Sequence, residues 1–167
     1  MKVRKATPHD FERILQIYRR ARGFMAQNGN PTQWGAVHPP ESLVAEDIRR
    51  GILYVLEHYP ENGDTPTVCG VFAFLPDGDE IYDNIDGKWL NDLPHAAIHR
   101  VASSGDVKGV MPACVSFCLS ICKNLKIDTH RDNTIMQHQL IKLGFSPCGS
   151  VYLKDGSERI AFQLYKE

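Results

Sequence analysis

The sequence predicts a mixed α/β domain with a mostly antiparallel sheet. Segments rich in β-branched and aromatic residues alternate with segments whose apolar residues recur every three to four positions. Two turn clusters, at residues 60–64 and 155–156, separate neighbouring β-rich runs closely enough for antiparallel hairpins. A further β-rich run, residues 96–101, is followed by a glycine-punctuated turn and a helix. Counted along the chain, these patterns indicate about six to seven strands and about four helices.

The first elements are a strand and a helix. Residues 2–5 form a short β-rich run, and Thr7 is followed by a proline and, three residues later, by Asp10. This order is typical of a helix start, with Thr7 as the N-cap and proline in the first turn. Apolar residues at helical spacing follow, and we expect the helix to end near Gly23.

A loop, a second helix and a hairpin are expected next. Residues 24–40 lack periodicity and are rich in Gly, Asn and Pro, which favours a loop. Residues 41–50 carry apolar side chains at helical spacing, and Gly51 is a typical stop. Residues 52–57 and 67–75 are β-rich and flank the first turn cluster, so we expect them to pair antiparallel.

The central strand leads into a turn that suits an anionic ligand. Strict alternation along residues 96–101 would place His99 and Val101 together on one face. Gly105 and Gly109 punctuate the turn, and the next helix would direct its free N–H groups and positive dipole end at one point. Such a point suits a phosphate or pyrophosphate. The chain contains neither a P-loop motif nor a dinucleotide-binding fingerprint.

The C-terminal third contains a strand, a helix and a hairpin. A β-rich run at residues 126–129 precedes a helix that we expect to end at Gly144. Two further β-rich runs flank Asp155-Gly156, which is a strong hairpin signal. We therefore expect the chain to close with an antiparallel strand pair.

Composition narrows the class of protein. With 167 residues and 43% hydrophobic content, the chain can bury the core of one domain. Its 19 Lys and Arg against 20 Asp and Glu give a formal net charge of −1, which favours neither nucleic acid nor an anionic membrane as partner. The N-terminus turns polar before an apolar signal segment forms, and no long apolar run follows. We therefore expect a cytoplasmic protein.

The five cysteines are expected to be free and buried. They show no CxxC spacing, and Cys114, Cys118 and Cys122 fall four residues apart on a predicted helix. This pattern favours small buried hydrophobic residues in a reducing compartment. A thiolate metal site would need a fourth well-placed ligand, so we expect no bound metal.

Two segments carry a family resemblance. Lys108, Met111 and Ala113 occupy the marked positions of the pattern Arg/Gln-x-x-Gly-x-Gly/Ala, and Asn133 precedes an apolar helix that ends in Leu143-Gly144-Phe145. In these segments and in its order of elements, the chain resembles the GNAT superfamily of N-acetyltransferases. The resemblance implies a single GNAT-like acyltransferase domain over residues 1–167, with acetyl-CoA as co-substrate.

The same resemblance assigns cofactor contacts by position. They lie at the end of the central strand, in the following turn and helix start, and before the last helix: Val101, Ala102, Ser103, Lys108, Gly109, Val110, Met111, Ala113 and Asn133. A main-chain N–H near Val101 would polarise the thioester carbonyl. Met111 stands where the family pattern has glycine.

The resemblance also suggests catalytic residues. His99 is the first candidate for the general base, because some amine acetyltransferases of the superfamily place a histidine on this strand. The alternative is a hydrogen-bonded structural histidine. Leu140 stands where many members carry a tyrosine that protonates the departing thiolate. Water, Tyr152 or His130 would then supply that proton, or the thiolate would leave without help.

The loop at residues 24–40 has two interpretations. Trp34 packs the loop onto the core or, as the resemblance implies, forms a wall of the acceptor site, with Asn28 and Gln33 as polar contacts. The implied function is transfer of an acetyl group from acetyl-CoA to a primary amine of a small molecule or peptide, by direct attack in a ternary complex. The alternative is a non-catalytic acyl-CoA-binding or interaction module, which Met111 favours. Because dimers are frequent in the superfamily, a homodimer is a further expectation.

Overall fold

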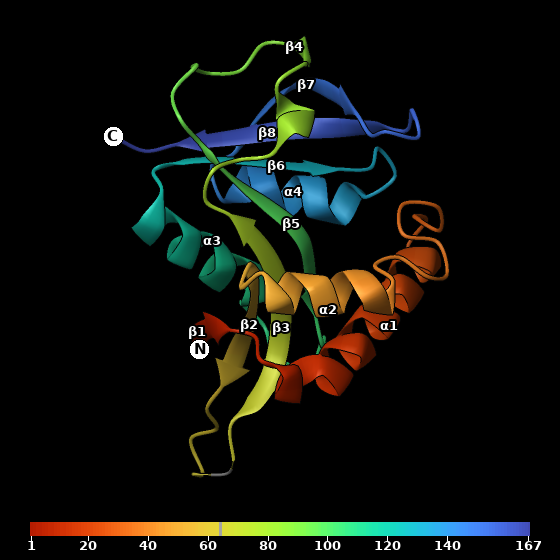
Figure 1. The fold of residues 1–167 in the computed structure, drawn as a ribbon, viewed down its shortest axis with the longest axis vertical. Coiled ribbons are helices and arrows are strands. Elements are labelled where there is room, and N and C mark those ends of the chain that lie inside the picture. The colour runs from red at the N-terminus through yellow and green to blue at the C-terminus, as the bar shows by residue number, and fades with distance from the viewer. Residues whose placement is uncertain (64) are drawn as a thin grey trace. The chain divides into compact units, whose positions relative to one another are not determined.

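The computed structural model describes residues 1–63 and 65–167, and the chain forms two compact units. The units comprise residues 1–74 with 100–117, and residues 75–99 with 118–167. In the described residues, eight strands are hydrogen-bonded in the order β1-β2-β3-β5-β6-β8-β7-β4, and there are four α-helices (Figure 1). The predicted mixed α/β fold with a mostly antiparallel sheet is confirmed.

The first unit contains three neighbouring strands and two helices. Strand β1 (Lys2–Lys5) pairs antiparallel with β2 (Leu53–His58), and β2 pairs antiparallel with β3 (Thr67–Leu75). Helices α1 (Phe11–Gln27) and α2 (Glu41–Arg49) contact one another, and α2 also contacts β2. The predicted hairpin and second helix are therefore present.

Helix α1 begins as predicted but ends later. A 3₁₀ turn, Pro8–Asp10, follows Thr7, and α1 continues from this turn to Gln27. The end expected near Gly23 is wrong, because the backbone there stays helical and a glycine ends a helix where it turns left-handed. That turn occurs at Gly29, whose φ is 82°.

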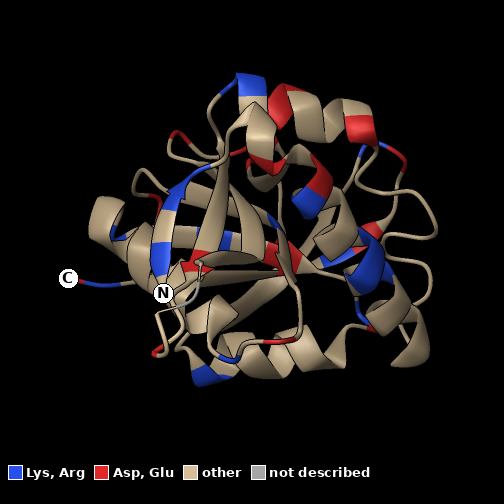
Figure 2. Cartoon of the chain, turned by 90° about the horizontal axis from the view of Figure 1, so that it is seen from below, with Lys and Arg blue, Asp and Glu red and all other residues tan. Residues whose placement is uncertain are grey.

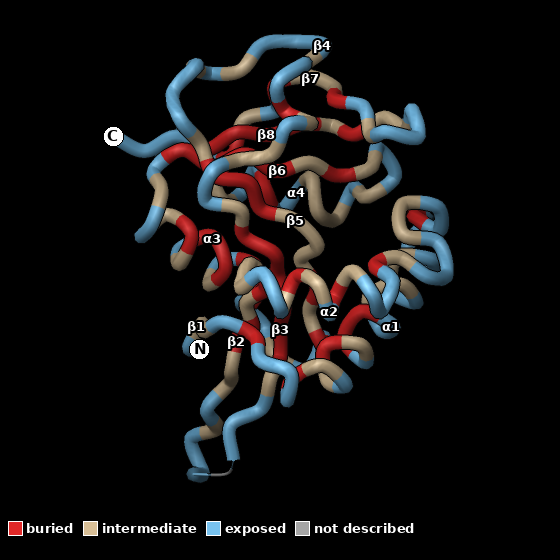
Figure 3. The backbone as a smooth tube through the Cα atoms, viewed as in Figure 1, coloured by how far each residue is buried: buried red, intermediate tan, exposed pale blue. Residues whose placement is uncertain are grey.

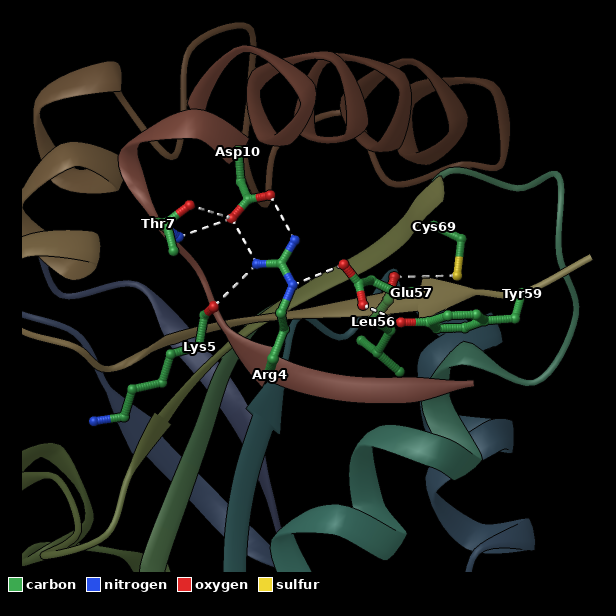
Figure 4. A network of polar contacts seen from close by, with 8 residues as sticks. All are labelled: Arg4, Lys5, Thr7, Asp10, Leu56, Glu57, Tyr59 and Cys69. Atoms are coloured by element: carbon green, nitrogen blue, oxygen red, sulfur yellow. Dashed lines mark hydrogen bonds and ion pairs between the residues drawn. The ribbon is translucent and has the colours of Figure 1, made fainter. Parts of the chain in front are cut away.

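Arg4 connects β1 to this first turn and to β2 (Figure 4). Its guanidinium contacts the two carboxylate oxygens of Asp10 at 2.8 and 2.9 Å and Glu57 Oε1 at 2.7 Å. Asp10 also accepts hydrogen bonds from the Thr7 hydroxyl at 3.0 Å and the Thr7 N–H at 2.8 Å. The hydrogen bonds from Arg4, helped by those from Thr7, lower the pKa of Asp10 to about 2.

Close packing in the first unit places the start of helix α3 (Val110–Ile121). A Cβ at Gly70 of β3 would lie 2.6 Å from the Val110 side chain and 3.0 Å from Leu56. Glycine therefore allows the first residue of α3 to pack against this strand. The Ser104 N–H, just before the turn, donates a hydrogen bond to the Cys69 carbonyl at 2.8 Å. Both ends of the turn that precedes α3 are thus held against β3.

The second unit contains the strands of the C-terminal third. Strand β6 (Asn124–Thr129) pairs antiparallel with β8 (Glu158–Tyr165), and β8 pairs antiparallel with β7 (Ser146–Tyr152). Strand β5 (Ala96–Ser103) begins in this unit, and its first three residues run parallel to β6. Helix α4 (Thr134–Lys142) contacts β7. Figure 3 shows β6 and β8 as largely buried strands.

One short strand exceeds the expected six to seven. Strand β4 (Asp86–Gly87) pairs antiparallel with residues 149–150 of β7. Gly87 and Gly149 face each other so closely that a Cβ on either would lie 2.2 Å from a backbone oxygen of the opposite strand. A two-residue strand has no periodicity from which the sequence could predict it.

The cysteines are free, as predicted, and Cys69, Cys114, Cys118 and Cys148 are buried, whereas Cys122 is half-buried. Within residues 1–63 and 65–167, no group of three His, Cys, Asp or Glu side chains is arranged to hold a metal ion. Figure 2 shows basic and acidic residues interspersed along the chain. None of the described helices combines the length and the apolar character needed to cross a membrane.

Candidate active site

His99 lies between two carboxylates of the second unit. Its Nε2 is 3.0 Å from Asp79 Oδ2, and its Nδ1 is 3.8 Å from Asp128 Oδ2. The imidazole is only 13% exposed. The short contact to Asp79 does not have the alignment of a hydrogen bond. The buried Nε2 therefore lies beside a carboxylate without a hydrogen bond to it. The imidazole therefore has a carboxylate near each of its two nitrogens.

Tyr82 packs against the ring of His99. Its ring stacks on His99, with centroids 5.7 Å apart and planes inclined by 21°. The Tyr82 hydroxyl donates a hydrogen bond of 2.7 Å to Asp128 Oδ2. Burial, together with the neighbouring Asp128 charge, raises the pKa of Tyr82 well above its ordinary value. Tyr82 therefore stays protonated at neutral pH, and its hydroxyl orients Asp128 by donating a hydrogen bond to the carboxylate.

Local structure positions both carboxylates. Asp79 is the N-cap of a 3₁₀ turn, Glu80–Tyr82, and its Oδ1 accepts a hydrogen bond from the Ile81 N–H at 3.0 Å. This turn carries Tyr82 as its last residue. Asp128 lies near the end of β6, and its Oδ1 is 4.0 Å from Arg159 Nε. One loop and one strand of the second unit thus converge on His99.

The sequence patterns singled out neither Asp79 nor Asp128, and for Tyr82 they left open whether its segment borders the site or only bridges to the central strand. The nearest signal was the acidic and aromatic segment at residues 81–92, which contains Tyr82 and whose contact with His99 depends on the fold of a loop. The signal for Asp128 was its place in the β-rich run at residues 126–129. Neither signal specifies a contact by itself.

The other two predicted catalytic residues are His130 and Tyr152. His130 Nδ1 accepts a hydrogen bond from the Asp132 N–H at 3.2 Å and is 3.5 Å from Asp132 Oδ2. Tyr152 ends β7 with about half of its surface exposed. Across the part of the chain that the structure describes, no hydrogen bond or ion pair links either residue to His99. Their assignment as proton donors stays a prediction.

The backbone of β5 departs from the alternation expected for residues 96–101. Arg100 has φ of 52°, in the left-handed region. A left-handed residue interrupts the pleat of a strand, so side chains before and after it no longer alternate in a simple way. The strict alternation expected for residues 96–101 is therefore interrupted at Arg100, and a shared face for His99 and Val101 stays a prediction.

The predicted cofactor segment belongs largely to the first unit. Lys108 and Gly109 are exposed, Gly109 has φ of 88°, and α3 begins directly after it. The Ala113 N–H donates to the Gly109 carbonyl at 3.1 Å, which is the first hydrogen bond of the helix. Pro112 lies before that bond, so its missing N–H removes no helical hydrogen bond. Met111 is buried, with 6% of its surface exposed.

The remaining predicted cofactor residues have ordinary structural surroundings. Asn133, in the second unit, is the N-cap of α4, and its Oδ1 accepts a hydrogen bond from the Met136 N–H at 3.1 Å. Ala102 is buried and Ser103 is half-buried at the end of β5. Leu140 is fully buried, as a core residue of α4 would be. Contacts of these residues with a cofactor stay predictions.

The predicted acceptor loop packs on the first unit through Trp34. The Trp34 ring meets the Tyr18 ring edge-on, with centroids 5.6 Å apart. Gln33 Oε1 accepts a hydrogen bond of 2.7 Å from the Asn30 amide, and the Asn28 amide donates to the Phe24 carbonyl at 2.8 Å. Packing of Trp34 onto the core is thus observed, and a role for these side chains in acceptor binding stays a prediction.

Comparison with solved structures defines the class of protein. An acetyltransferase of the GNAT family from Streptococcus agalactiae is 30% identical, with a TM-score of 0.80 over 99% of this chain and 95% of that chain. A GNAT-family acetyltransferase from Listeria monocytogenes is 18% identical, with a TM-score of 0.67 over 99% and 94% of the two chains. The yncA protein of Salmonella typhimurium, solved with its cofactor acetyl-CoA, is 16% identical, with a TM-score of 0.60 over 99% and 94%.

No family model matches the chain, and no curated protein matches it either. The likeness to the streptococcal protein covers nearly the whole of both chains at 30% identity. The chain therefore belongs to the GNAT family of acetyltransferases.

Proposed function

We propose that the chain is an acetyl-CoA-dependent N-acetyltransferase whose single functional domain spans residues 1–167. Its acceptor is a primary amine of a small molecule or a peptide, which attacks the thioester directly in a ternary complex. The observation that carries this proposal is the placement of His99 between Asp79 and Asp128, at 3.0 and 3.8 Å. A transfer to nitrogen needs a group that accepts a proton, and this imidazole is suited to that task.

The start of α3 fits the diphosphate of acetyl-CoA. Since the first helical hydrogen bond is donated by Ala113, the amides of Val110 and Met111 have no acceptor within the helix. Gly109 has a left-handed backbone and is exposed, and Lys108 beside it adds a positive charge. We assign the diphosphate to this turn and a further cofactor contact to Asn133. When bound, acetyl-CoA supplies an acetyl group already activated as a thioester.

His99 is proposed as the general base. An amine is protonated at neutral pH, so one proton must leave it before or during attack. His99 accepts that proton at an imidazole nitrogen, directly or through one water. The imidazolium that forms is then stabilised by Asp79 and Asp128, while Tyr82 keeps Asp128 oriented through its hydrogen bond. Alignment of amine and thioester supplies much of the remaining acceleration.

During attack the thioester carbonyl oxygen would gain negative charge. The main-chain N–H of Val101 is proposed to stabilise that oxygen by donating a hydrogen bond to it. The departing thiolate would then take a proton from water, since the aliphatic side chain of Leu140 has no acidic group. His130 and Tyr152 are the protein groups proposed as substitutes for that water.

A second candidate function is a non-catalytic acyl-CoA-binding or interaction module. Met111 and Leu140 favour it, because they stand where the family pattern has glycine and where many members have tyrosine. This candidate predicts binding of acetyl-CoA without turnover, or no binding at all.

The test measures CoA release with a panel of small amines, amino acids and peptides. Wild-type protein should release CoA with at least one acceptor, and His99→Ala should lower kcat about 100-fold, as expected for loss of a general base. His9→Ala, in the first 3₁₀ turn, is the matched control and should retain wild-type kcat.

Isothermal titration with acetyl-CoA separates the two candidates. Binding with turnover supports the enzyme. Binding without turnover on any acceptor would support the module, and wild-type kcat in His99→Ala would remove His99 as the base.

A further inference from the structure

Arg100 adopts a backbone conformation that its side chain does not favour. Among the described residues, it is the one non-glycine residue with positive φ, at 52°. This left-handed region crowds the Cβ of an L-residue, so it persists only where the surroundings impose it. Arg100 lies between His99, the proposed base, and Val101, whose N–H is the proposed donor to the thioester carbonyl. An unfavoured conformation at this position therefore needs a cause in the surrounding contacts.

The first contact holds the Arg100 side chain. Its Nη2 and Nε lie 2.7 and 3.0 Å from Asp47 Oδ2, and Asp47 on α2 is 1% exposed. A buried carboxylate would be strongly destabilising if its cationic partner were removed. The ion pair thus ties residue 100 of β5 to a fixed point on α2.

The second contact holds the Arg100 backbone. The Tyr18 hydroxyl, on α1, donates a hydrogen bond of 3.1 Å to the Arg100 carbonyl oxygen. Tyr18 is 1% exposed, and its burial raises the pKa of the hydroxyl, which keeps the donor protonated. The Arg100 carbonyl and the Val101 N–H belong to one planar peptide group. Whatever fixes the direction of that carbonyl also fixes the direction of the Val101 N–H.

We propose that Tyr18 and Asp47 are positioning residues for acetyl transfer. Together they hold Arg100 in the left-handed conformation and thereby aim the Val101 N–H at the place where the thioester oxygen becomes negative. This inference rests on the proposed function, in which Val101 is that donor. Asp47 acts through the Arg100 side chain, and Tyr18 acts through the peptide group itself. Neither residue needs to touch a substrate.

Glycine and alanine at position 100 separate backbone conformation from side-chain charge. Both variants lose the ion pair with Asp47, but glycine adopts a positive φ readily and alanine does not. If the conformation matters, Arg100→Gly should keep kcat at least about fivefold above Arg100→Ala. If Arg100 acts only as a charge, both variants should lose the same fraction of kcat, and that result would overturn the inference.

Tyr18→Phe tests the contact to the peptide group. We expect kcat to fall about tenfold, with KM for acetyl-CoA within about twofold of wild type, because a misdirected donor weakens the transition state more than binding. Tyr59→Phe, on an exposed tyrosine of the same unit, should change neither value. Should Tyr18→Phe not fold, Asp47→Asn takes its place with the same expected split between kcat and KM.

An amide NMR measurement without substrate keeps this test independent of turnover. The Val101 amide resonance should shift in Tyr18→Phe and Arg100→Ala and stay in place in Tyr59→Phe. An unmoved Val101 resonance in Tyr18→Phe contradicts the inference even if the wild type is active. A moved resonance in a protein that turns over no acceptor supports the positioning contacts and counts against the proposed function alone.

Discussion

Tyr82 binds Asp128 through its hydroxyl, at 2.7 Å, while the face of its ring stacks on His99. One buried side chain therefore fixes both the proposed base and a carboxylate beside it. Trp89 meets the same ring edge-on, at 5.6 Å, and donates its indole N–H to the Tyr82 carbonyl at 3.0 Å. Tyr82 is thus held on several sides, and its removal should be felt in stability and in catalysis.

Tyr82→Phe should lower the free energy of unfolding by about 1.5–3 kcal/mol, because the buried carboxylate of Asp128 loses the hydrogen bond that the Tyr82 hydroxyl donates to it. The stacked ring remains, so kcat should fall only about tenfold. Urea unfolding and CoA release measure the two effects. Tyr165→Phe makes the same change on an exposed tyrosine of β8 and should alter neither quantity. Unchanged unfolding of Tyr82→Phe would show that water replaces the hydroxyl at Asp128.

Asp79→Asn should reduce kcat about five- to tenfold while leaving stability close to wild type. Asparagine is as good an N-cap as aspartate, so the turn that begins at Asp79 keeps its hydrogen bond. What is lost is the negative charge 3.0 Å from His99 Nε2, which would stabilise the imidazolium. The control is Asp77→Asn, an exposed acid two positions earlier. If both variants have the wild-type kcat, Asp79 has only a capping role.

Asp10→Asn should make stability less dependent on acidic pH. The pKa of Asp10 is lowered from 3.8 to about 2, so its carboxylate contributes stability above pH 3.8 and loses it as the pH falls through about 2. At pH 7 the difference between wild type and variant should be about 2 kcal/mol. Urea unfolding at pH 7, 4 and 2 would show that difference shrink toward low pH. Glu61→Gln, an exposed acid of the same unit, should give no such trend.

Gly70→Ala and Gly23→Ala should have opposite effects. The new Cβ at position 70 would lie 2.6 Å from Val110, so we expect a loss of about 1–3 kcal/mol and a weaker affinity for acetyl-CoA as α3 shifts. At position 23 the new Cβ meets nothing within 4 Å on a helix, so we expect a gain of about 0.5–1 kcal/mol. Thermal unfolding and titration calorimetry measure both. A Gly70→Ala protein of wild-type stability would mean that Val110 moves aside without cost.

Most of the fold could be predicted because its signals are local. The hairpin of residues 52–57 and 67–75, the α2 helix and the final strand pair depend on periodicity and turn residues that lie next to one another in the chain. The end of α1 could not be decided in that way. Gly23 and Gly29 look alike in sequence, and only the backbone that packing imposes shows which of them turns left-handed.

Some single residues of the candidate site could be predicted from the sequence, but the contacts between them could not. His99 and the turn at Lys108–Gly109 have recognisable patterns, and the solved structures confirm the family to which those patterns pointed. Asp79, Asp128 and the contact of Tyr82 with His99 were missed, because contacts between a loop, a strand and a second strand leave no spacing in the sequence. The same holds for the buried pair of Asp47 and Arg100.

By itself, the sequence determined most of the segments that become helices and strands and indicated the family of the chain, since both depend on short-range patterns of apolar, glycine and capping residues. The tertiary structure alone decided that His99 lies beside two carboxylates and that Arg100 takes a left-handed backbone. Those outcomes depend on residues 20 to 82 positions apart being brought into contact, and the energy of such a contact exists only once the chain has folded.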